Sequence, residues 1–177
     1  MIQLTGSAQR SFFFPSKLDE AFALYGDIRQ SFRYLIRISV IHSYAAGQFR
    51  LLYSSLESGL YRVKIFCDVL ATIDENKYCI RISPIKGNEP VKSEAGLYSM
   101  TGEGFYNSII LFRECGDRTR IEYNIEMKAS LPAPITLRWM PNALMNSIAQ
   151  NRLNLHTDEI MDSFIEKSIQ AYVSFRR

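Results

Sequence analysis

The chain has 177 residues, of which 47% are hydrophobic and 22% are charged, a size and composition typical of one globular domain. Its formal net charge is +3 and basic residues alternate with acidic ones, whereas a nucleic-acid-binding protein usually gathers Lys and Arg on one face, so we expect no nucleic-acid partner. Three cysteines without CxxC spacing, and no apolar run near 20 residues, argue against a disulfide framework and a membrane-spanning helix.

The N-terminal part of the chain predicts one strand and two short helices. We expect the strand over residues 8–14, before Pro15. Gly26 is expected to end the first helix, and Asp27 can cap a second one that continues to Leu35. The first helix is predicted from apolar residues at helical spacing, namely Leu18, Ala21, Phe22 and Tyr25.

From residue 36 onward the apolar residues follow the period of two that is typical of strands. This pattern indicates an antiparallel sheet of about seven strands with one apolar face. The inward face of the first two strands is predicted to carry Ile36, Ile38, Val40, His42 and Tyr44, and then Phe49, Leu51 and Tyr53. The longest alternation carries Tyr61, Val63, Ile65, Cys67, Val69, Ala71 and Ile73 inward, with Arg62, Lys64, Asp68 and Thr72 outward. Later strands are predicted over 78–82, as a pair within 97–114, and over Ile121, Tyr123, Ile125 and Met127.

A long helix is predicted over about residues 141–173, after the proline-marked link Leu131-Pro132-Ala133-Pro134. A sheet with one apolar face needs a cover, and this helix is long enough to provide it. We therefore expect residues 1–177 to form a single α+β domain, in which a curved antiparallel sheet surrounds the C-terminal helix and two short helices follow the first strand. The apolar stripe of the long helix is predicted to contain Leu144, Met145, Ile148, Leu155, Ile160, Phe164, Ile165 and Ile169.

The order of these elements resembles the START-like superfamily, also called birch-pollen-allergen-like. The segments that carry the likeness are Gly102-Glu103-Gly104-Phe105, residues 119–123, the link 131–134 and residues 160–166. They are most similar to a branch found in cyanobacteria and plastids. The resemblance implies a helix-grip fold with a cavity between sheet and long helix, which in this superfamily often holds lipids, sterols, pigments or aromatic small molecules. It implies no shared catalytic residue, because the superfamily includes carriers, cyclases and regulators.

The candidate ligand-binding residues are aromatic and aliphatic side chains of the predicted inner face. A cavity with a few hydroxyl groups on apolar walls would satisfy the tyrosines through a ligand or water, whereas a filled core would need a partner for every hydroxyl. We favour the cavity over the filled core. Its expected lining is His42, Tyr44, Phe49, Tyr53, Tyr61, Val63, Ile65, Tyr78, Ile80, Tyr123, Ile125, Trp139, Met145 and Ile148.

The two histidines are expected in different places. His42 falls on the apolar face of its strand, where it could orient a ligand or act as a general base; we favour the structural alternative, a half-buried side chain bonded to backbone or tyrosine. His156 lies near Asp158 and Glu159 on the long helix, which predicts a solvated position. Two histidines argue against a zinc site, and no catalytic motif is present. We therefore expect no metal, no cofactor and no catalytic residue.

The segment Pro134–Pro141 contains the sole tryptophan, Trp139, beside Arg138. Trp and Arg are enriched where proteins bind partners. The segment is therefore predicted to form a lip at the cavity mouth or a surface for a protein partner. Packing of the segment under the long helix is the structural alternative.

Three functions are compatible with these patterns. The favoured one is non-enzymatic binding or carriage of a hydrophobic or aromatic small molecule, such as a lipid, pigment or isoprenoid. The second is protein interaction or assembly, for example of photosynthetic complexes, with a vestigial cavity, and the third is a cyclase-like enzyme that uses His42 and a tyrosine. A large open cavity favours the first, a filled one with an apolar outer patch the second, and a His–Tyr or His–carboxylate pair in the cavity the third. We expect a cytoplasmic protein, or a stromal one in a plastid-bearing host, with at most peripheral membrane contact.

Overall fold

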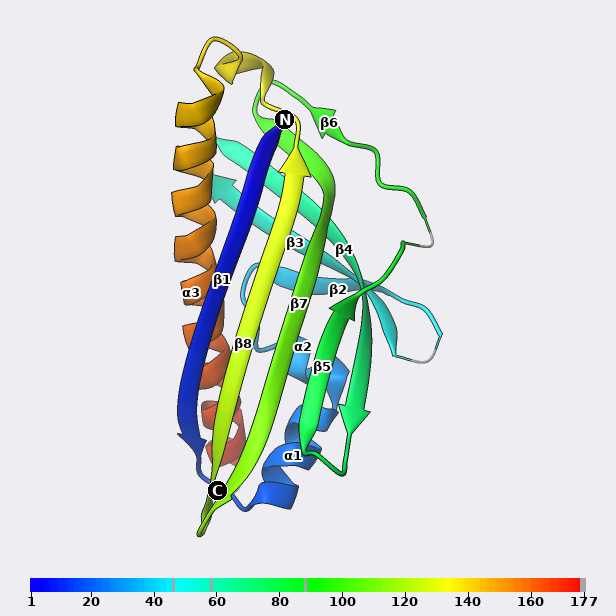
Figure 1. Ribbon diagram of the computed structural model, residues 1–177, viewed down its shortest axis with the longest axis vertical. Helices are drawn as coiled ribbons and strands as arrows, with labels where there is room; N and C mark the ends of the chain where they lie inside the picture. Colours follow the sequence, from blue (N-terminus) through cyan, green and yellow to red (C-terminus); the bar gives the residue numbers. More distant parts are fainter. Residues whose placement is uncertain (46, 58, 88, 176–177) are drawn as a thin grey trace.

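The computed structural model describes residues 1–45, 47–57, 59–87 and 89–175, and within them the chain forms eight strands, three α-helices and one 3-10 helix (Figure 1). The strands make one sheet, and the longest helix lies beside it. The bounds in chain order are β1 (Ile2–Phe14), α1 (Leu18–Gly26), α2 (Ile28–Phe32), β2 (Ile38–Ser43), β3 (Gln48–Glu57), β4 (Tyr61–Asp74), β5 (Cys79–Pro84), β6 (Glu94–Ala95), β7 (Ser99–Cys115), β8 (Arg118–Leu131), η1 (Ile135–Leu137) and α3 (Asn142–Phe175).

The strand order in the sheet is β1-β8-β7-β5-β4-β3-β2, and the two-residue β6 pairs with β7. β1 pairs with β8 over its whole length, from Ile2 opposite Leu131 to Phe14 opposite Thr119. Neighbouring strands are antiparallel, and beyond the end of the short β5 residues 62–66 of β4 also pair in parallel with residues 99–103 of β7. β1 therefore forms one edge of the sheet and β2 the other.

The predicted inward and outward faces are confirmed for β8 and for the first half of β4, whereas Ile73 near the end of β4, predicted to face inward, is 44% exposed. In β4, Val63 and Ile65 are 6% and 2% exposed, whereas Arg62, which precedes them on the opposite face, is exposed. In β8, Tyr123 and Ile125 are each 2% exposed. Because side chains alternate along a strand, a slip of one residue would have reversed all of these positions. The α+β helix-grip class predicted from the sequence is confirmed.

Helix α3 runs beside β1 along most of the sheet (Figure 1), and its buried residues join the core on the inner face. A Cβ atom at Gly6 of β1 would overlap the Thr157 hydroxyl and the Leu153 side chain of α3. Glycine at this position therefore permits helix and strand to approach more closely than any other residue would.

Side chains of α3 also satisfy backbone donors of β1. Asn146 accepts the backbone N–H of Gln3, with 3.3 Å between nitrogen and oxygen. Gln150, one turn later, accepts that of Thr5 at 3.0 Å. An edge strand normally leaves such groups unpaired, so the helix both covers the sheet and completes its edge.

Two strands extend beyond their predicted limits. β1 begins at Ile2, well before the predicted start at residue 8, because the small residues Gly6 and Ala8 weaken an alternation that in fact starts at Ile2. The predicted strand pair within 97–114 is one continuous strand, β7, beside the short β6. Gly102 and Gly104 lie inside β7, where side chains of β8 and β4 approach the backbone closely.

The long helix was predicted at the right place, but its buried stripe was predicted with errors. Leu144 and Leu155 are 50% and 49% exposed, whereas Leu153 and Met161 are 4% and 0% exposed. The buried stripe also contains polar residues, so hydrophobicity alone misplaced its edges. Those polar residues are His156, Thr157 and Ser168.

The expected solvent position of Asp68 is wrong. Asp68 is 6% exposed and forms a two-bond ion pair with Arg50 of β3, at 2.8 and 2.6 Å. The chain after β5 covers this pair from the outer side: Ile85 donates its backbone N–H to the Asp68 carbonyl, and Arg50 also donates to the carbonyl of Glu89. A strand pattern cannot show that a later loop will fold over its polar face.

We expect Phe164→Ala to lower the free energy of unfolding by about 3–5 kcal/mol. Phe164 is 2% exposed, and its ring lies 4.8 Å from that of Tyr123 and 5.4 Å from that of Tyr25, between centroids. Urea denaturation measures the change. Phe175→Ala is the matched control on the same helix, because Phe175 is 94% exposed and should contribute almost nothing. Equal midpoints for both variants would show that α3 docks by another face.

Candidate functional site

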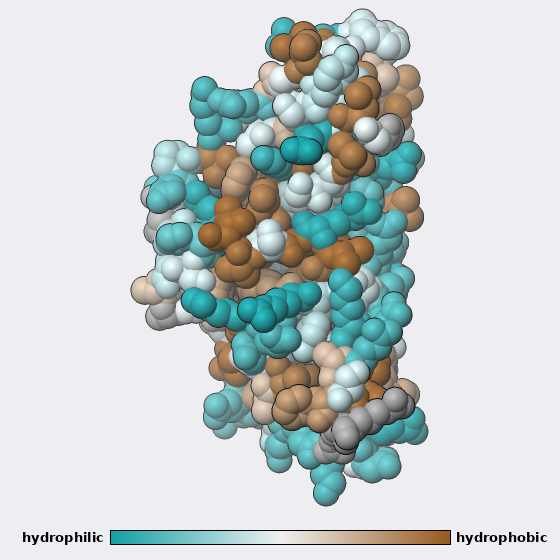
Figure 2. Space-filling view, turned by 180° about the vertical axis from the view of Figure 1, so that it is seen from behind, coloured by the Kyte–Doolittle hydropathy of each residue, from teal (hydrophilic) through white to brown (hydrophobic). Residues whose placement is uncertain are grey.

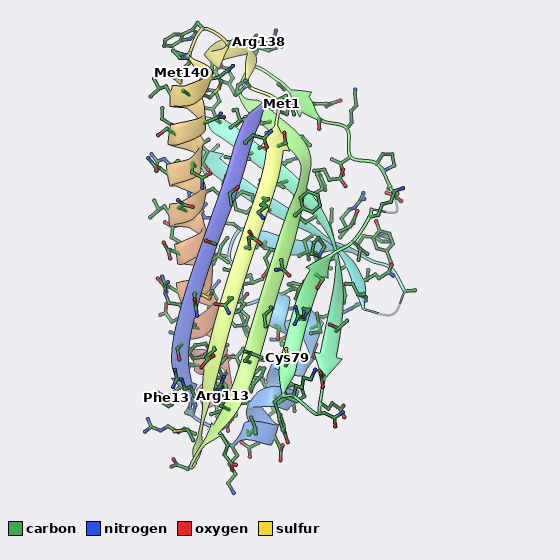
Figure 3. The ribbon with its side chains drawn as sticks, viewed as in Figure 1. Met1, Phe13, Cys79, Arg113, Arg138 and Met140 are labelled. Carbon is green, nitrogen blue, oxygen red and sulfur yellow. The ribbon has the colours of Figure 1, made fainter. Side chains whose placement is uncertain are left out.

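A cavity of about 240 Å³ lies between α3 and the sheet, at the end of the molecule where α3 begins. Met1 and Met140 mark this end in Figure 3. The cavity is partly open to solvent, and most of its wall is apolar. The apolar residues are Ile2, Leu4, Val63, Met100, Leu131, Leu137, Met140, Met145, Ile148, Ala149 and Leu153.

Polar side chains from β3, β4 and α3 line the same cavity: Tyr53, Ser55, Glu57, Tyr61, Arg152 and His156. The alternation of side chains along β3 turns Tyr53, Ser55 and Glu57 to one face. Helical spacing places His156 one turn beyond Arg152. We call Tyr53, Ser55, Glu57 and His156 the polar corner of the cavity.

The centre of the polar corner is a hydrogen bond between Tyr53 and His156. The Tyr53 hydroxyl lies 2.7 Å from Nδ1 of His156, and Oε1 of Glu57 lies 3.4 Å from the same nitrogen. His156 is 6% exposed. Ser55 is 5% exposed, and its hydroxyl has no hydrogen-bond partner among the residues that the structure describes. The corner thus combines a hydrogen-bonded pair, a carboxylate and a hydroxyl that a bound molecule can reach.

Burial and neighbouring charges set the protonation of the polar corner. Burial lowers the pKa of His156. Burial also raises the pKa of Tyr53 to about 12, and the nearby Ser55 hydroxyl opposes this rise. At neutral pH the imidazole and the phenol are therefore both uncharged. The charges that also act on the pKa of His156, in decreasing order, are those of Glu57, Arg37, Glu159 and Arg152.

An uncharged imidazole, a phenol and a carboxylate in one cavity can orient a polar group by hydrogen bonds or exchange protons with it. A His–Tyr pair in the cavity is the arrangement that the sequence analysis associated with a cyclase-like enzyme. Such a pair is present, but it contains His156 in place of His42.

The link between β8 and α3 closes part of the cavity, through Leu137 and Met140. The hydroxyls of Tyr61 and Thr136 lie 3.2 Å apart, and Thr136 donates to the backbone carbonyl of Leu97 at 2.9 Å. These bonds hold the link against β4 and against the chain between β6 and β7. The Tyr61 hydroxyl is thereby engaged in structure.

Aromatic side chains fill the other end of the space between α3 and the sheet. Phe164 packs there on Tyr25 and Tyr123. The Tyr123 hydroxyl pairs with that of Tyr106 at 3.2 Å, and the Tyr25 hydroxyl with that of Ser168 at 2.7 Å. A space of about 20 Å³ remains, enough for about one water. The cavity and the filled core, which the sequence analysis treated as alternatives, therefore each describe one half of the molecule.

The predicted lining residues fall into three groups. The first group lines the cavity: Tyr53, Tyr61, Val63, Met145 and Ile148. The second group is buried in the core away from this cavity: Phe49, Ile65, Ile80, Tyr123 and Ile125. The third group lies outside both: His42, Tyr44, Tyr78 and Trp139. That any of these residues binds a ligand stays a prediction.

The inward placement of His42 is wrong. The pairing of β2 with β3 shifts between Val40 and His42, so that Ile41 is an extra residue in β2. Such a β-bulge changes the facing of the residues that follow it. His42 and Ile41 are exposed, and the His42 ring lies against that of Tyr44, 4.5 Å between centroids. A bulge leaves no mark in a period-two pattern.

Tyr78 and Trp139 lie outside the cavity for local reasons. The Tyr78 hydroxyl donates to Asp19 at 2.9 Å and its ring packs on Phe22, so this tyrosine joins the sheet to α1. Trp139 is 79% exposed. The neighbouring Met140 lines the cavity in its place, so the predicted lip exists but Trp139 does not face inward.

Sequence reasoning missed Ser55, Glu57, Arg152 and His156. Ser55 and Glu57 continue the alternation of Tyr53 along β3, and that spacing alone would have placed them on the inner face. Helical spacing from Met145, a buried residue in the first turn of α3, likewise places Arg152 and His156 on the cavity side. The polarity of these residues led to the wrong expectation that His156 is solvated.

Among the described residues, no group of three or more His, Cys, Asp and Glu side chains is arranged to hold a metal ion. No helix in the described part of the chain has both the length and the apolar character needed to cross a membrane.

Burial raises the pKa of Cys67 to about 12, so its thiol is protonated and poorly reactive at neutral pH.

Comparison with known proteins identifies the fold. No family model and no curated protein matches the sequence. A conserved protein from Geobacillus kaustophilus has a similar structure, with a TM-score of 0.56 and 10% identity over 97% of this chain and 95% of that one. A protein from Thermus thermophilus gives a TM-score of 0.53 and 16% identity over 94% of this chain and 98% of that one.

An enzyme also has this architecture. Norcoclaurine synthase from Thalictrum flavum, solved with dopamine and hydroxybenzaldehyde, gives a TM-score of 0.50 and 11% identity over 99% of this chain and 90% of that one. Identities this low show a shared fold alone. The chain has the helix-grip fold that the sequence resemblance implied; the likeness to a cyanobacterial and plastid branch of the START-like superfamily stays a prediction.

We expect the stability of the fold to decrease as the pH falls below about 6.5, the ordinary pKa of histidine. The pKa of His156 is lower in the folded state, so the unfolded state takes up the proton first and protonation favours unfolding. His156→Gln should remove this part of the pH dependence, measured by urea unfolding between about pH 7.5 and 5. His42→Gln, which replaces the exposed histidine, should retain it. The same slope in wild type and His156→Gln would contradict the assignment.

Proposed function

We propose that the protein binds and carries a compact hydrophobic small molecule in the cavity at the start of α3. The observation that supports this most directly is the cavity itself, about 240 Å³ with a largely apolar wall. Protein interiors are close-packed and leave few voids larger than a water molecule. A largely apolar wall with a few polar groups at one side is the typical composition of a small-molecule site.

The cavity volume limits the ligand. Sites for drug-sized molecules usually span about 300–1,000 Å³, and this cavity is smaller. Of the ligand classes expected from the sequence, a short isoprenoid or a single-ring aromatic molecule fits, whereas a large pigment or a long-chain lipid would extend through the opening.

We propose binding without turnover. General acid–base catalysis works best when the pKa of the catalytic group lies near the working pH. Burial moves the pKa of Tyr53 upward and that of His156 downward, away from neutrality in both cases. Conversion of a bound molecule by the wild type, absent in His156→Gln with binding intact, would show that the protein is an enzyme.

The test of the proposed site uses cumene, an apolar molecule of nine carbon atoms. We expect cumene to bind the wild type and to shift backbone amide NMR signals around the cavity. Ala149→Phe should weaken binding by more than about tenfold, because Ala149 lines the cavity and the added ring occupies it. Ala143→Phe is the matched control, since Ala143 is exposed on the same helix. Equal affinity of both variants would place cumene elsewhere.

A protein-binding function is a second candidate, because apolar side chains are exposed around the link and the start of α3. Trp139 is 79% exposed, and Arg138 lies beside it. Figure 2 shows hydrophobic residues at the surface of the upper half of the molecule. Exposed Trp and Arg side chains are typical of residues that contribute strongly to binding a partner. The other exposed apolar residues in this region are Leu97, Tyr98, Ile135, Leu144 and Ile148.

We expect Trp139→Ala to abolish co-purification of a partner from the native host and to leave the affinity for cumene unchanged. The physical reason is that the indole is exposed and lies outside the cavity lining. Phe175→Ala, which removes an exposed ring at the other end of α3, is the control and should retain the partner. A partner held equally by wild type and Trp139→Ala would exclude this surface.

A further inference from the structure

We propose that Tyr53 and Ser55 form a subsite that donates two hydrogen bonds to a neutral carbonyl oxygen. The cavity would then select a compact ketone or aldehyde over a hydrocarbon of equal size. This inference deepens the proposed function and rests on it, because it specifies the chemical class of the molecule held in the same cavity.

The first support is the hydroxyl of Ser55. It lines the cavity, its residue is 5% exposed, and it makes no hydrogen bond within 3.5 Å to any described residue, although it lies close enough to the Tyr53 hydroxyl to lower the pKa of that group. Buried polar groups are nearly always hydrogen-bonded, because an unpaired one costs free energy. A ligand oxygen in the cavity would supply the missing partner. Ser55 is two residues from Tyr53 on the same strand and therefore on the same face.

The second support is the position of Glu57. Its Oε1 lies 3.4 Å from Nδ1 of His156, and the Tyr53 oxygen lies 2.7 Å from the same nitrogen. A carboxylate beside Nδ1 favours the tautomer that carries the proton on Nδ1. In that tautomer the imidazole donates to the Tyr53 oxygen. The proton of the Tyr53 hydroxyl is then free to point into the cavity, which makes Tyr53 a donor to the ligand.

The third support is the charge beside the subsite. Glu57, on the same face of β3 as Tyr53 and Ser55, has a side chain that is 19% exposed, whereas Arg152 lines the cavity but is exposed to solvent. A buried anion requires an opposite charge close by. The subsite therefore suits a neutral ligand with an acceptor oxygen better than a carboxylate. A carbonyl oxygen has two lone pairs, which matches two hydroxyl donors.

The test compares three molecules with nine non-hydrogen atoms each: acetophenone, cumene and benzoate. Dissociation constants are measured with the wild-type protein by NMR titration. We expect acetophenone to bind about three- to tenfold more tightly than cumene, as one or two neutral hydrogen bonds would give. We expect benzoate to bind more weakly than acetophenone. Tighter binding of benzoate would overturn the choice of a neutral carbonyl.

Two variants assign the preference to its residues. Tyr53→Phe and Ser55→Ala each remove one of the two donors, so each should reduce the ratio of acetophenone affinity to cumene affinity about two- to threefold. Tyr44→Phe is the matched control. Tyr44 lies outside the cavity lining, with its ring against that of His42, so this variant should keep the preference of the wild type.

The outcomes separate this inference from the proposed function. Failure of both cumene and acetophenone to bind would refute the binding site itself. Equal affinity for the two, unchanged in Tyr53→Phe, would refute the subsite and leave the cavity as an apolar site. The nitrogen NMR shifts of His156 provide a measurement without mutation. We expect a protonated Nδ1, and an unprotonated Nδ1 would overturn the inference, because Tyr53 would then donate to it.

Discussion

The direct contact of helix α3 with the backbone of β1 determines where everything else in this molecule lies. Gly6 permits the approach, since a side chain there would meet Leu153 and Thr157. Asn146 and Gln150 hold the helix at one axial position through backbone donors of β1. A helix is a rigid rod that rises about 1.5 Å per residue, so these contacts also set the height of each later side chain above the sheet. The depth of the cavity follows from them.

Along this one helix, the space above the sheet changes from open to filled. At the start, Met145 and Ala149 face the sheet and leave room between them and β3. Further along the helix, Phe164 meets Tyr25 and Tyr123, whose rings occupy the same layer. Large rings have strong packing interactions, so the filled half supplies stability that the open half does not. The fold can therefore keep a void at one end without depending on it for stability.

The spacing of apolar residues along the chain predicted much of this structure. Several residues were misplaced because their polarity suggested a position in solvent. The period-two segments and the apolar stripe of the long helix predicted the fold class. They also predicted that Val63 and Tyr123 face inward, and they identified part of the cavity wall. The position of His42 depended on a bulge with one extra residue, which no pattern along β2 reveals. The position of His156 followed from the helical period, but a histidine next to acidic residues suggested solvent. Ser55 and Glu57 were missed for the same reason.

Some polar residues of this chain occupy positions where the spacing of a strand or helix predicts an apolar, inward-facing residue. These positions differ most from the rest of the core. A buried hydroxyl without any partner costs about 1–3 kcal/mol, and the Ser55 hydroxyl has no partner among the described residues. His156 adds a further cost when it is protonated, because burial disfavours its charge. Apolar side chains at these two places would make a more stable core, as is common where a site trades stability for function. The other half of the molecule pairs its buried tyrosine hydroxyls with each other or with serine. The two halves of the molecule therefore differ in how completely their buried hydroxyl groups are paired within the described residues.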